Sequence, residues 1–195
     1  MKTPLLKIYI FFISILLFGC HSNENPCKLP DSVLKDIDKI DSLTKLPEVR
    51  ERDRTWNLNN YKEPSLISAQ YETYRFIWHT YFDGVNICRV EKINGNYKAI
   101  TKTFKDQDSI PGIKEFSISS KMWNNIVDSL SINGFWSYPG SIERNGLDGA
   151  TWILEGYKPT ADECTGKNYH RLTRWSPIDK KFIEMCNLLN SLKTD

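Results

Sequence analysis

The chain has 195 residues, of which 40% are hydrophobic and 26% are charged, and its formal net charge is +2. Residues 1–19 contain two lysines and no acidic residue, so the rest of the chain has no net charge. A neutral domain lacks the excess of Lys and Arg with which proteins bind nucleic acid phosphates, and the length fits one domain with its own core.

The first twenty residues predict an export signal. Residues 8–18 form an uncharged apolar run, which is too short for a transmembrane helix of roughly 20 apolar residues. The run ends in Leu17-Phe18-Gly19-Cys20, which resembles the lipobox of bacterial lipoproteins. We expect residues 1–19 to be a cleaved signal peptide and Cys20 to become the lipidated N-terminus. An ordinary cleaved signal peptide and an uncleaved anchor remain alternatives.

A lipid on Cys20 would hold the protein on the membrane without a protein span. Each methylene buried in the bilayer contributes about 0.8 kcal/mol, so several acyl chains such as palmitate together give stable attachment. The lipobox resemblance implies a Gram-negative cell envelope. Because His21 stands where aspartate would favour the inner membrane, we expect the outer membrane.

The segment after the anchor predicts a tether followed by a helical region. Residues 20–30 are short, polar and proline-containing, which is typical of a flexible tether. Residues 31–70 form an N-terminal helical and connecting segment, in which apolar residues three positions apart predict a helix over residues 31–46. We expect a single folded domain over residues 71–195.

Three strands are predicted at the start of this domain, over residues 71–82, 85–93 and 96–104. Asp83-Gly84 and Asn94-Gly95 separate them, and both dipeptides favour two-residue hairpin turns because they tolerate positive φ. The second turn sets a register that pairs Ile93 with Asn96. Glu91 then lies opposite Lys98, and Val90 lies opposite Ala99, so that opposite charges meet across the ladder.

Two helices and a second hairpin follow. An apolar stripe from Trp123 to Leu130 predicts an amphipathic helix, with Ser119 as its cap and Gly134 at its end. Residues 150–157 and 168–175 predict two strands, which pair Leu154 with Leu172. A capping box over residues 176–179, with Pro177 at the first helical position, predicts a last helix that Phe182, Cys186 and Leu189 line.

The predicted element order is βββαββα, which indicates an α+β fold. The expected architecture is a five-stranded antiparallel sheet with two helices packed on one face, preceded by the N-terminal helical or irregular segment.

Three motifs in the domain resemble a known group of proteins. They are Tyr74-Arg75-Phe76-Ile77-Trp78, the stretch GLDGATWILEG over residues 146–156, and YHRLTRWSP over residues 169–177. With them, residues 63–192 resemble a family of uncharacterised bacterial lipoproteins. The resemblance implies a shared fold and an envelope location, and it implies no activity.

Cysteine pairing is left open by the sequence. If Cys20 is lipidated, the remaining cysteines are Cys27, Cys88, Cys164 and Cys186, which allow three disulfide connectivities or free thiols. Their spacings match no zinc site, so we expect no metal and no cofactor.

Catalytic candidates are few. His79 and His170 could form an acid–base pair with Asp148 or Glu155, but neither histidine has a ligand or nucleophile spacing around it. Ser176 and Cys164 lack the context of a nucleophile. The glycine-punctuated residues 146–149 lead into a strand and therefore predict a turn, not a phosphate loop.

One face of the first three strands is a candidate protein-binding surface, because it mixes aromatic residues with both signs of charge. Its expected members are Phe76, Trp78, Arg89, Glu91, Lys98 and Lys102, together with Tyr74 and Ile100. The opposite face, with Ile77, Cys88, Val90 and Ala99, would lie under the helices. The alternative is an outer sheet face that the N-terminal segment covers.

A second candidate is a polar cluster on the later hairpin, where Glu155 would face Arg171 and Trp152 would face Arg174. It either holds a ligand or consists of cross-strand ion pairs and arginine stacking, which folds use routinely. The expected function is non-catalytic binding by a lipid-anchored envelope protein. The alternatives are an immunity or inhibitor lipoprotein that acts on an envelope toxin or hydrolase, and a hydrolase. The oligomeric state stays open.

Overall fold

The structure is a computed structural model that describes residues 61–67, 69–80, 84–105, 110–142, 149–162 and 165–193. The expectations for the signal peptide, Cys20, the tether and the helix over residues 31–46 lie outside these ranges.

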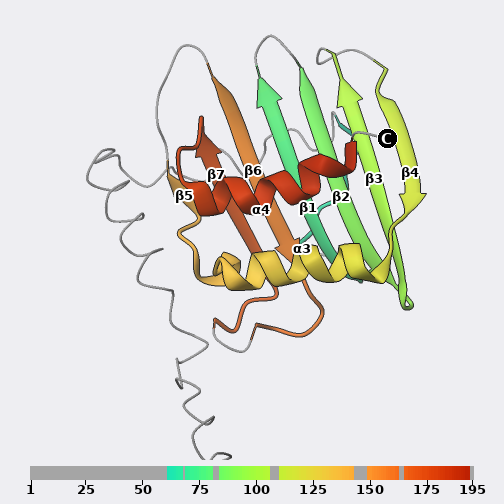
Figure 1. The fold of residues 1–195 in the computed structure, drawn as a ribbon, viewed down its shortest axis with the longest axis vertical. Coiled ribbons are helices and arrows are strands. Elements are labelled where there is room, and N and C mark those ends of the chain that lie inside the picture. Colours follow the sequence, from blue (N-terminus) through green and yellow to red (C-terminus); the bar gives the residue numbers. More distant parts are fainter. Residues whose placement is uncertain are drawn as a thin grey trace, which may run out of the picture.

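A seven-stranded sheet forms the centre of the fold (Figure 1). Its order is β4-β3-β2-β1-β6-β7-β5, and neighbouring strands are antiparallel except for the two-residue β5, which runs parallel to β7. The strands are β1 (Glu72–Thr80), β2 (Val85–Ile93), β3 (Asn96–Phe104), β4 (Gly112–Ser117), β5 (Ser141–Ile142), β6 (Ala150–Tyr157) and β7 (Tyr169–Trp175).

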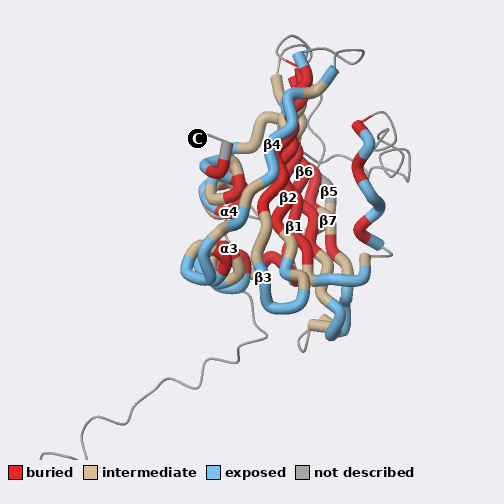
Figure 2. The backbone as a smooth tube through the Cα atoms, turned by 90° about the vertical axis from the view of Figure 1, so that its right-hand side faces the viewer, coloured by how far each residue is buried: buried red, intermediate tan, exposed pale blue. Residues whose placement is uncertain are grey.

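Two helices, α3 (Ser120–Ile132) and α4 (Lys180–Asn190), pack on the same face of the sheet (Figures 1 and 2). Two short 3-10 helices, η2 (Phe135–Ser137) and η3 (Ser191–Lys193), follow them. The α+β class with an antiparallel sheet and two helices is therefore confirmed.

The predicted number of five strands is wrong, because neither β4 nor the two-residue β5 was expected. Strand β4 is the longer of the two. Its sequence, GIKEFS, has no apolar alternation, and most of its residues are exposed at the edge of the sheet. Backbone pairing with β3 defines this strand, and an edge strand needs only one such partner.

The register at the second hairpin is confirmed. Asn94 and Gly95 have φ angles of 50° and 82°, as a two-residue hairpin turn requires, and Ile93 pairs with Asn96. Glu91 lies opposite Lys98, as expected.

The register at the first hairpin differs from the expected one. The amide of Thr80 donates to the carbonyl of Gly84, and Phe76 pairs with Cys88. A two-residue turn at residues 83–84 would instead have placed Phe76 opposite Glu91. The difference is three residues, and an odd shift moves every side chain of a strand to the other face.

The main core lies between the sheet and the helices. The sheet contributes buried side chains that include Tyr74, Phe76, Cys88, Val90, Ala99, Leu154 and Leu172. The helical elements contribute Trp123, Ile126 and Leu130 from α3, Phe135 and Trp136 from η2, and Phe182, Met185, Cys186 and Leu189 from α4. Cys88 and Cys186 form no disulfide and are buried in this core, whereas Cys27 and Cys164 lie outside the described residues.

A second, smaller core lies on the opposite face of the sheet. It consists of Tyr61, Ile77, Val85, Ile87, Phe104 and Ile153. Tyr61 belongs to residues 61–67, which we call the strap because they cross this face. The strap alternates buried and exposed residues on the side of the sheet away from the helices (Figure 2).

The helix starts agree with the sequence in one case and differ in the other. Ser119 caps α3 as expected, since its hydroxyl accepts from the amide of Met122 at 3.1 Å. Helix α4 begins at Lys180, and its cap is Asp179, not Ser176. Ser176 has a φ of 41° and lies outside the helix, so the expected capping box is wrong.

Asp179 should be one of the more sensitive positions outside the apolar core. One carboxylate oxygen accepts from the amide of Lys181 at 3.0 Å, and the other accepts from the hydroxyl of Tyr138 at 2.6 Å. We predict that Asp179→Ala lowers the free energy of unfolding by about 2 kcal/mol, because the helix loses its cap and a buried hydroxyl loses its acceptor. Urea unfolding measures this loss. Ser176→Ala is the control, and a larger loss for the control would restore the capping box.

Candidate binding face

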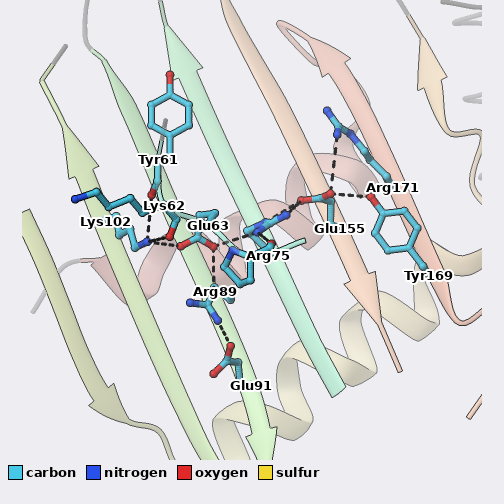
Figure 3. A network of polar contacts seen from close by, with 11 residues as sticks. Tyr61, Lys62, Glu63, Arg75, Arg89, Glu91, Lys102, Glu155, Tyr169 and Arg171 are labelled. Carbon is cyan, nitrogen blue, oxygen red and sulfur yellow. Dashed lines mark hydrogen bonds and ion pairs between the residues drawn. The ribbon is translucent and has the colours of Figure 1, made fainter. Parts of the chain in front are cut away.

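Charged side chains from five neighbouring strands meet on the face of the sheet that the helices leave open (Figure 3). Strand register explains this gathering, because residues that pair directly project to the same face. Arg75 in β1 pairs with Arg89 on one side and with Glu155 on the other. Glu155 in turn pairs with Arg171 in β7.

Three cations converge on the carboxylate of Glu63 in the strap. Its Oε2 accepts from Arg75 Nη1 at 3.1 Å and from Arg89 Nε at 3.0 Å, and its Oε1 lies 2.7 Å from Lys102 Nζ. All four residues are at most 9% exposed. We call Arg75, Arg89 and Lys102, which come from β1, β2 and β3, the cation cluster.

Backbone carbonyls of the strap complete this contact. Lys102 Nζ donates to the carbonyls of Lys62 at 2.8 Å and Tyr61 at 3.2 Å, and Arg75 Nη1 donates to that of Pro64 at 2.7 Å. In these hydrogen bonds the sheet supplies the donors and the strap supplies the acceptors.

Glu155 is the second carboxylate of the network. It accepts from Arg75 through Nε at 2.8 Å and Nη2 at 2.6 Å, and from the hydroxyl of Tyr169 at 2.7 Å. Arg171 Nη1 lies 4.0 Å from Glu155 Oε1. The guanidinium of Arg75, which is 0% exposed, thus joins the two carboxylates Glu63 and Glu155 (Figure 3).

The direction of the pKa shift differs among these groups. Burial alone would lower the pKa of Arg75, but Glu155 and Glu63 outweigh it and raise that pKa. Burial lowers the pKa of Arg89, and the neighbouring Arg75 adds to this effect. Burial, followed by the charge of Glu155, raises the pKa of the Tyr169 hydroxyl. Arg75 is therefore held firmly in its charged form.

The rim of the network is more exposed to solvent. Arg89 Nη1 donates to Glu91, and Lys98 Nζ lies 3.6 Å from Glu91 and 3.2 Å from Glu115. The side chain of Glu115 is 58% exposed, so solvent screens this pair and it adds little stability.

The expected protein-binding surface is divided between the two faces of the sheet. Phe76 and Trp78 lie on the helix side, where Phe76 is 1% exposed and its ring centroid is 5.2 Å from that of Trp152. The four charged members, Arg89, Glu91, Lys98 and Lys102, lie on the open side. A single aromatic and charged face is therefore wrong, and the register at the first hairpin is the reason.

The predicted polar cluster on the later hairpin is divided in the same way. Its register is confirmed, with Glu155 opposite Arg171 and Trp152 opposite Arg174. The two pairs lie an odd number of residues apart along the strand, so they project to opposite faces. Arg174 lies over the ring of Phe182 on the helix side and donates to the carbonyl of Gly140 at 3.0 Å.

The two histidines do not converge. His79 projects to the open face with Arg75, whereas His170 projects into the core beside Phe135. Nε2 of His170 donates to the carbonyl of Tyr138 at 2.9 Å, and burial lowers the pKa of this ring to about 4. An acid–base pair of His79 and His170 is therefore wrong.

Ser176 is the nucleophile candidate that the structure describes. The hydroxyl of Ser176 accepts from the amide of Ala150 at 3.3 Å, and Asp148 and Cys164 lie outside the described residues. Within the described ranges, no group of three or more His, Cys, Asp or Glu side chains could hold a metal ion. In the same ranges, no helix is long and apolar enough to cross a membrane.

Sequence reasoning missed two residues at the centre of the site. Glu63 lies in a stretch without periodicity, and no local pattern marks it. Arg75 carried a usable signal, since it is the charged residue within the aromatic and apolar run YRFIW over residues 74–78. Such a residue is almost never fully buried unless it is paired.

Comparison with known proteins adds no assignment. No protein-family model matches the chain, and no curated protein matches it.

Loss of the Glu63 charge should destabilise the fold strongly. We predict that Glu63→Gln lowers the free energy of unfolding by about 3 kcal/mol, because three buried cations lose a shared anion. The matched control is Glu115→Gln, which removes an exposed carboxylate and should change stability by less than about 1 kcal/mol. Urea unfolding at pH 7 compares the two, and equal effects would contradict the account.

His170 should make stability depend on pH. Its folded pKa of about 4 is below the ordinary 6.5, so the unfolded chain binds the proton first as pH falls. The contribution is fully present above pH 6.5 and is lost between pH 6.5 and 4, by up to about 3 kcal/mol.

The variant His170→Gln keeps a neutral donor and cancels this contribution. Subtracting its unfolding free energy from that of the wild type at each pH isolates the histidine. A flat difference between pH 6.5 and 4 would show that His170 is not buried as a neutral ring.

Proposed function

We propose that the chain is a lipid-anchored envelope protein that binds a protein partner and catalyses no reaction. The observation that carries this proposal is the contact between the strap and the cation cluster. The three cations, which come from three adjacent strands, bind one carboxylate and several backbone carbonyls of the strap, which lies outside the sheet. An acidic segment of another protein can be recognised by the same charge-assisted hydrogen bonds.

The anchor defines where such binding takes place. Cys20 at the end of the lipobox carries the lipid, and residues 20–30 form the tether. A flexible chain of this length spans roughly 20 Å on average, by the square-root dependence on residue number. The tether and the segment that follows it hold the domain near the outer membrane, where it meets its partner.

A hydrolase is less well supported. Acid–base chemistry would need a histidine beside a nucleophile or a carboxylate, whereas His170 is buried against Phe135 and donates to a backbone carbonyl. An immunity or inhibitor lipoprotein is one form of the proposed binding protein, and no contact among the described residues favours it over other forms.

The anchor can be tested with two cysteine variants. We predict that Cys20→Ser abolishes the incorporation of labelled palmitate and moves the protein from the membrane fraction to the soluble fraction. Cys27→Ser is the matched control, because it removes a cysteine seven positions further along and leaves the lipobox intact. Labelling of the Cys20→Ser variant at the wild-type level would contradict the lipid anchor.

The binding function is tested by crosslinking in the native envelope, followed by mass spectrometry. We expect a specific protein partner, and Lys98→Glu at the rim of the open face should reduce its recovery, because the new carboxylate repels an acidic segment. Lys121→Glu on α3, which lies on the helix side, is the control and should leave recovery unchanged. Recovery of no specific partner would contradict the proposed function.

A further inference from the structure

The strap contacts the sheet through two different anchors that are two residues apart. The ring of Tyr61, which is 4% exposed, meets that of Phe104 edge-on at 4.9 Å between centroids and completes the small apolar core. Glu63, which is 5% exposed, enters the cation cluster. Lys62 lies between them and is exposed, with a φ of 50° that turns the chain between the anchors.

The rest of the strap follows the same division. Pro64 and Ser65 are exposed, and Leu66 is buried at 2%. The strap therefore buries an aromatic ring, a carboxylate and a leucine, while its other side chains are exposed. Short recognition peptides use a few such anchors for specificity and main-chain hydrogen bonds for affinity.

Charge makes the cation cluster incomplete without the strap. The three cations of the cluster have two nearby carboxylates within the sheet, Glu155 and Glu91. Taking Glu63 away leaves these three cations with one positive charge in excess. Another carboxylate can replace Glu63 through the same charge-assisted hydrogen bonds, so the open site favours an acidic ligand.

We propose that the strap is a displaceable internal ligand, and that the site beneath it binds an extended segment of a partner protein. The segment carries an aromatic residue, a carboxylate two positions later and an aliphatic residue three positions after that. This inference rests on the proposed binding function and names the chemistry of the partner.

The covalent link between the strap and the domain determines how tightly the chain can bind a separate segment. A strap joined to its own site by a few residues acts at an effective concentration in the millimolar range, so a separate ligand must compete with it. The wild-type chain should therefore bind such a segment weakly, and a chain whose own strap lacks both anchors should bind it well.

The test uses the full chain with Tyr61→Ser and Glu63→Ser, and the labelled peptide YKEPSLI, which has the sequence of residues 61–67. The control peptide YKQPSLI differs by one charge. Fluorescence anisotropy should give at least tenfold tighter binding of YKEPSLI than of YKQPSLI, and at least tenfold weaker binding of YKEPSLI to the wild type. Adding Lys102→Met to the variant should remove the preference for glutamate.

Five outcomes would overturn the inference. Two are that the variant binds both peptides equally and that it binds neither. Loss of its cooperative unfolding transition would make the strap an integral part of the core. Displacement of YKEPSLI by millimolar phosphate would reveal a simple anion site. A wild-type dimer that the double variant converts to a monomer would assign the site to the strap of a second copy.

The peptide experiment and the proposed function fail separately. A specific crosslinked partner in the envelope, together with no preference for YKEPSLI, would keep the binding function and reject this ligand. A preference for YKEPSLI without any crosslinked envelope partner would keep this ligand and reject the binding function in the envelope.

Discussion

The guanidinium of Arg75 organises the open face of the sheet. It lies in β1, the central strand of the seven, is 0% exposed, and donates to Glu155 on one side and Glu63 on the other. A buried charge requires compensation, and these two carboxylates supply it. Glu63 in turn holds the strap against the sheet, and Glu155 accepts a hydrogen bond from Tyr169 in the neighbouring strand β7. The polar half of this face therefore depends on one buried cation.

The two faces of the sheet are stabilised by different kinds of contact. The helix side is apolar, and aromatic residues such as Trp123 and Phe182 fill the space between sheet and helices. The open side combines a small apolar core with a charged network, and the strap covers both. Tyr61 packs in the small apolar core, and Glu63 pairs with the cations of the charged network. A segment of seven residues thus converts an open sheet face into a covered one, and this is why its displacement would create a site.

Much of the fold could be predicted from local sequence signals. Turn chemistry at Asn94-Gly95 fixed one register, the apolar stripe of α3 with its cap at Ser119 fixed a helix, and the pairing of Leu154 with Leu172 was correct. The prediction failed where local signals compete or are absent. Asp83-Gly84 indicated a two-residue turn, but tertiary packing of the aromatic residues of β1 against the helices selects a different register. Strand β4 lacks alternation because most of its residues are exposed at the sheet edge, where backbone pairing with β3 defines the strand.

The candidate site was harder to predict than the fold, because it depends on long-range contacts. Lys102 and Arg89 were recognised as charged residues of one face, but the shift at the first hairpin wrongly added Phe76 and Trp78. Glu63 could not be found, since its partners lie 12 to 39 positions away in three strands. The arginine within the run YRFIW over residues 74–78 was the local signal that a carboxylate had to come from elsewhere.

Hydrogen exchange of the backbone amides tests the central claim most directly, because it measures the free energy of opening for each segment. If the strap is a separable unit that Glu63 holds in place, amides of residues 61–67 exchange through an opening of lower free energy than those of β1 and β2. Exchange of strap and strand amides at one common free energy, equal to that of global unfolding, would contradict the account.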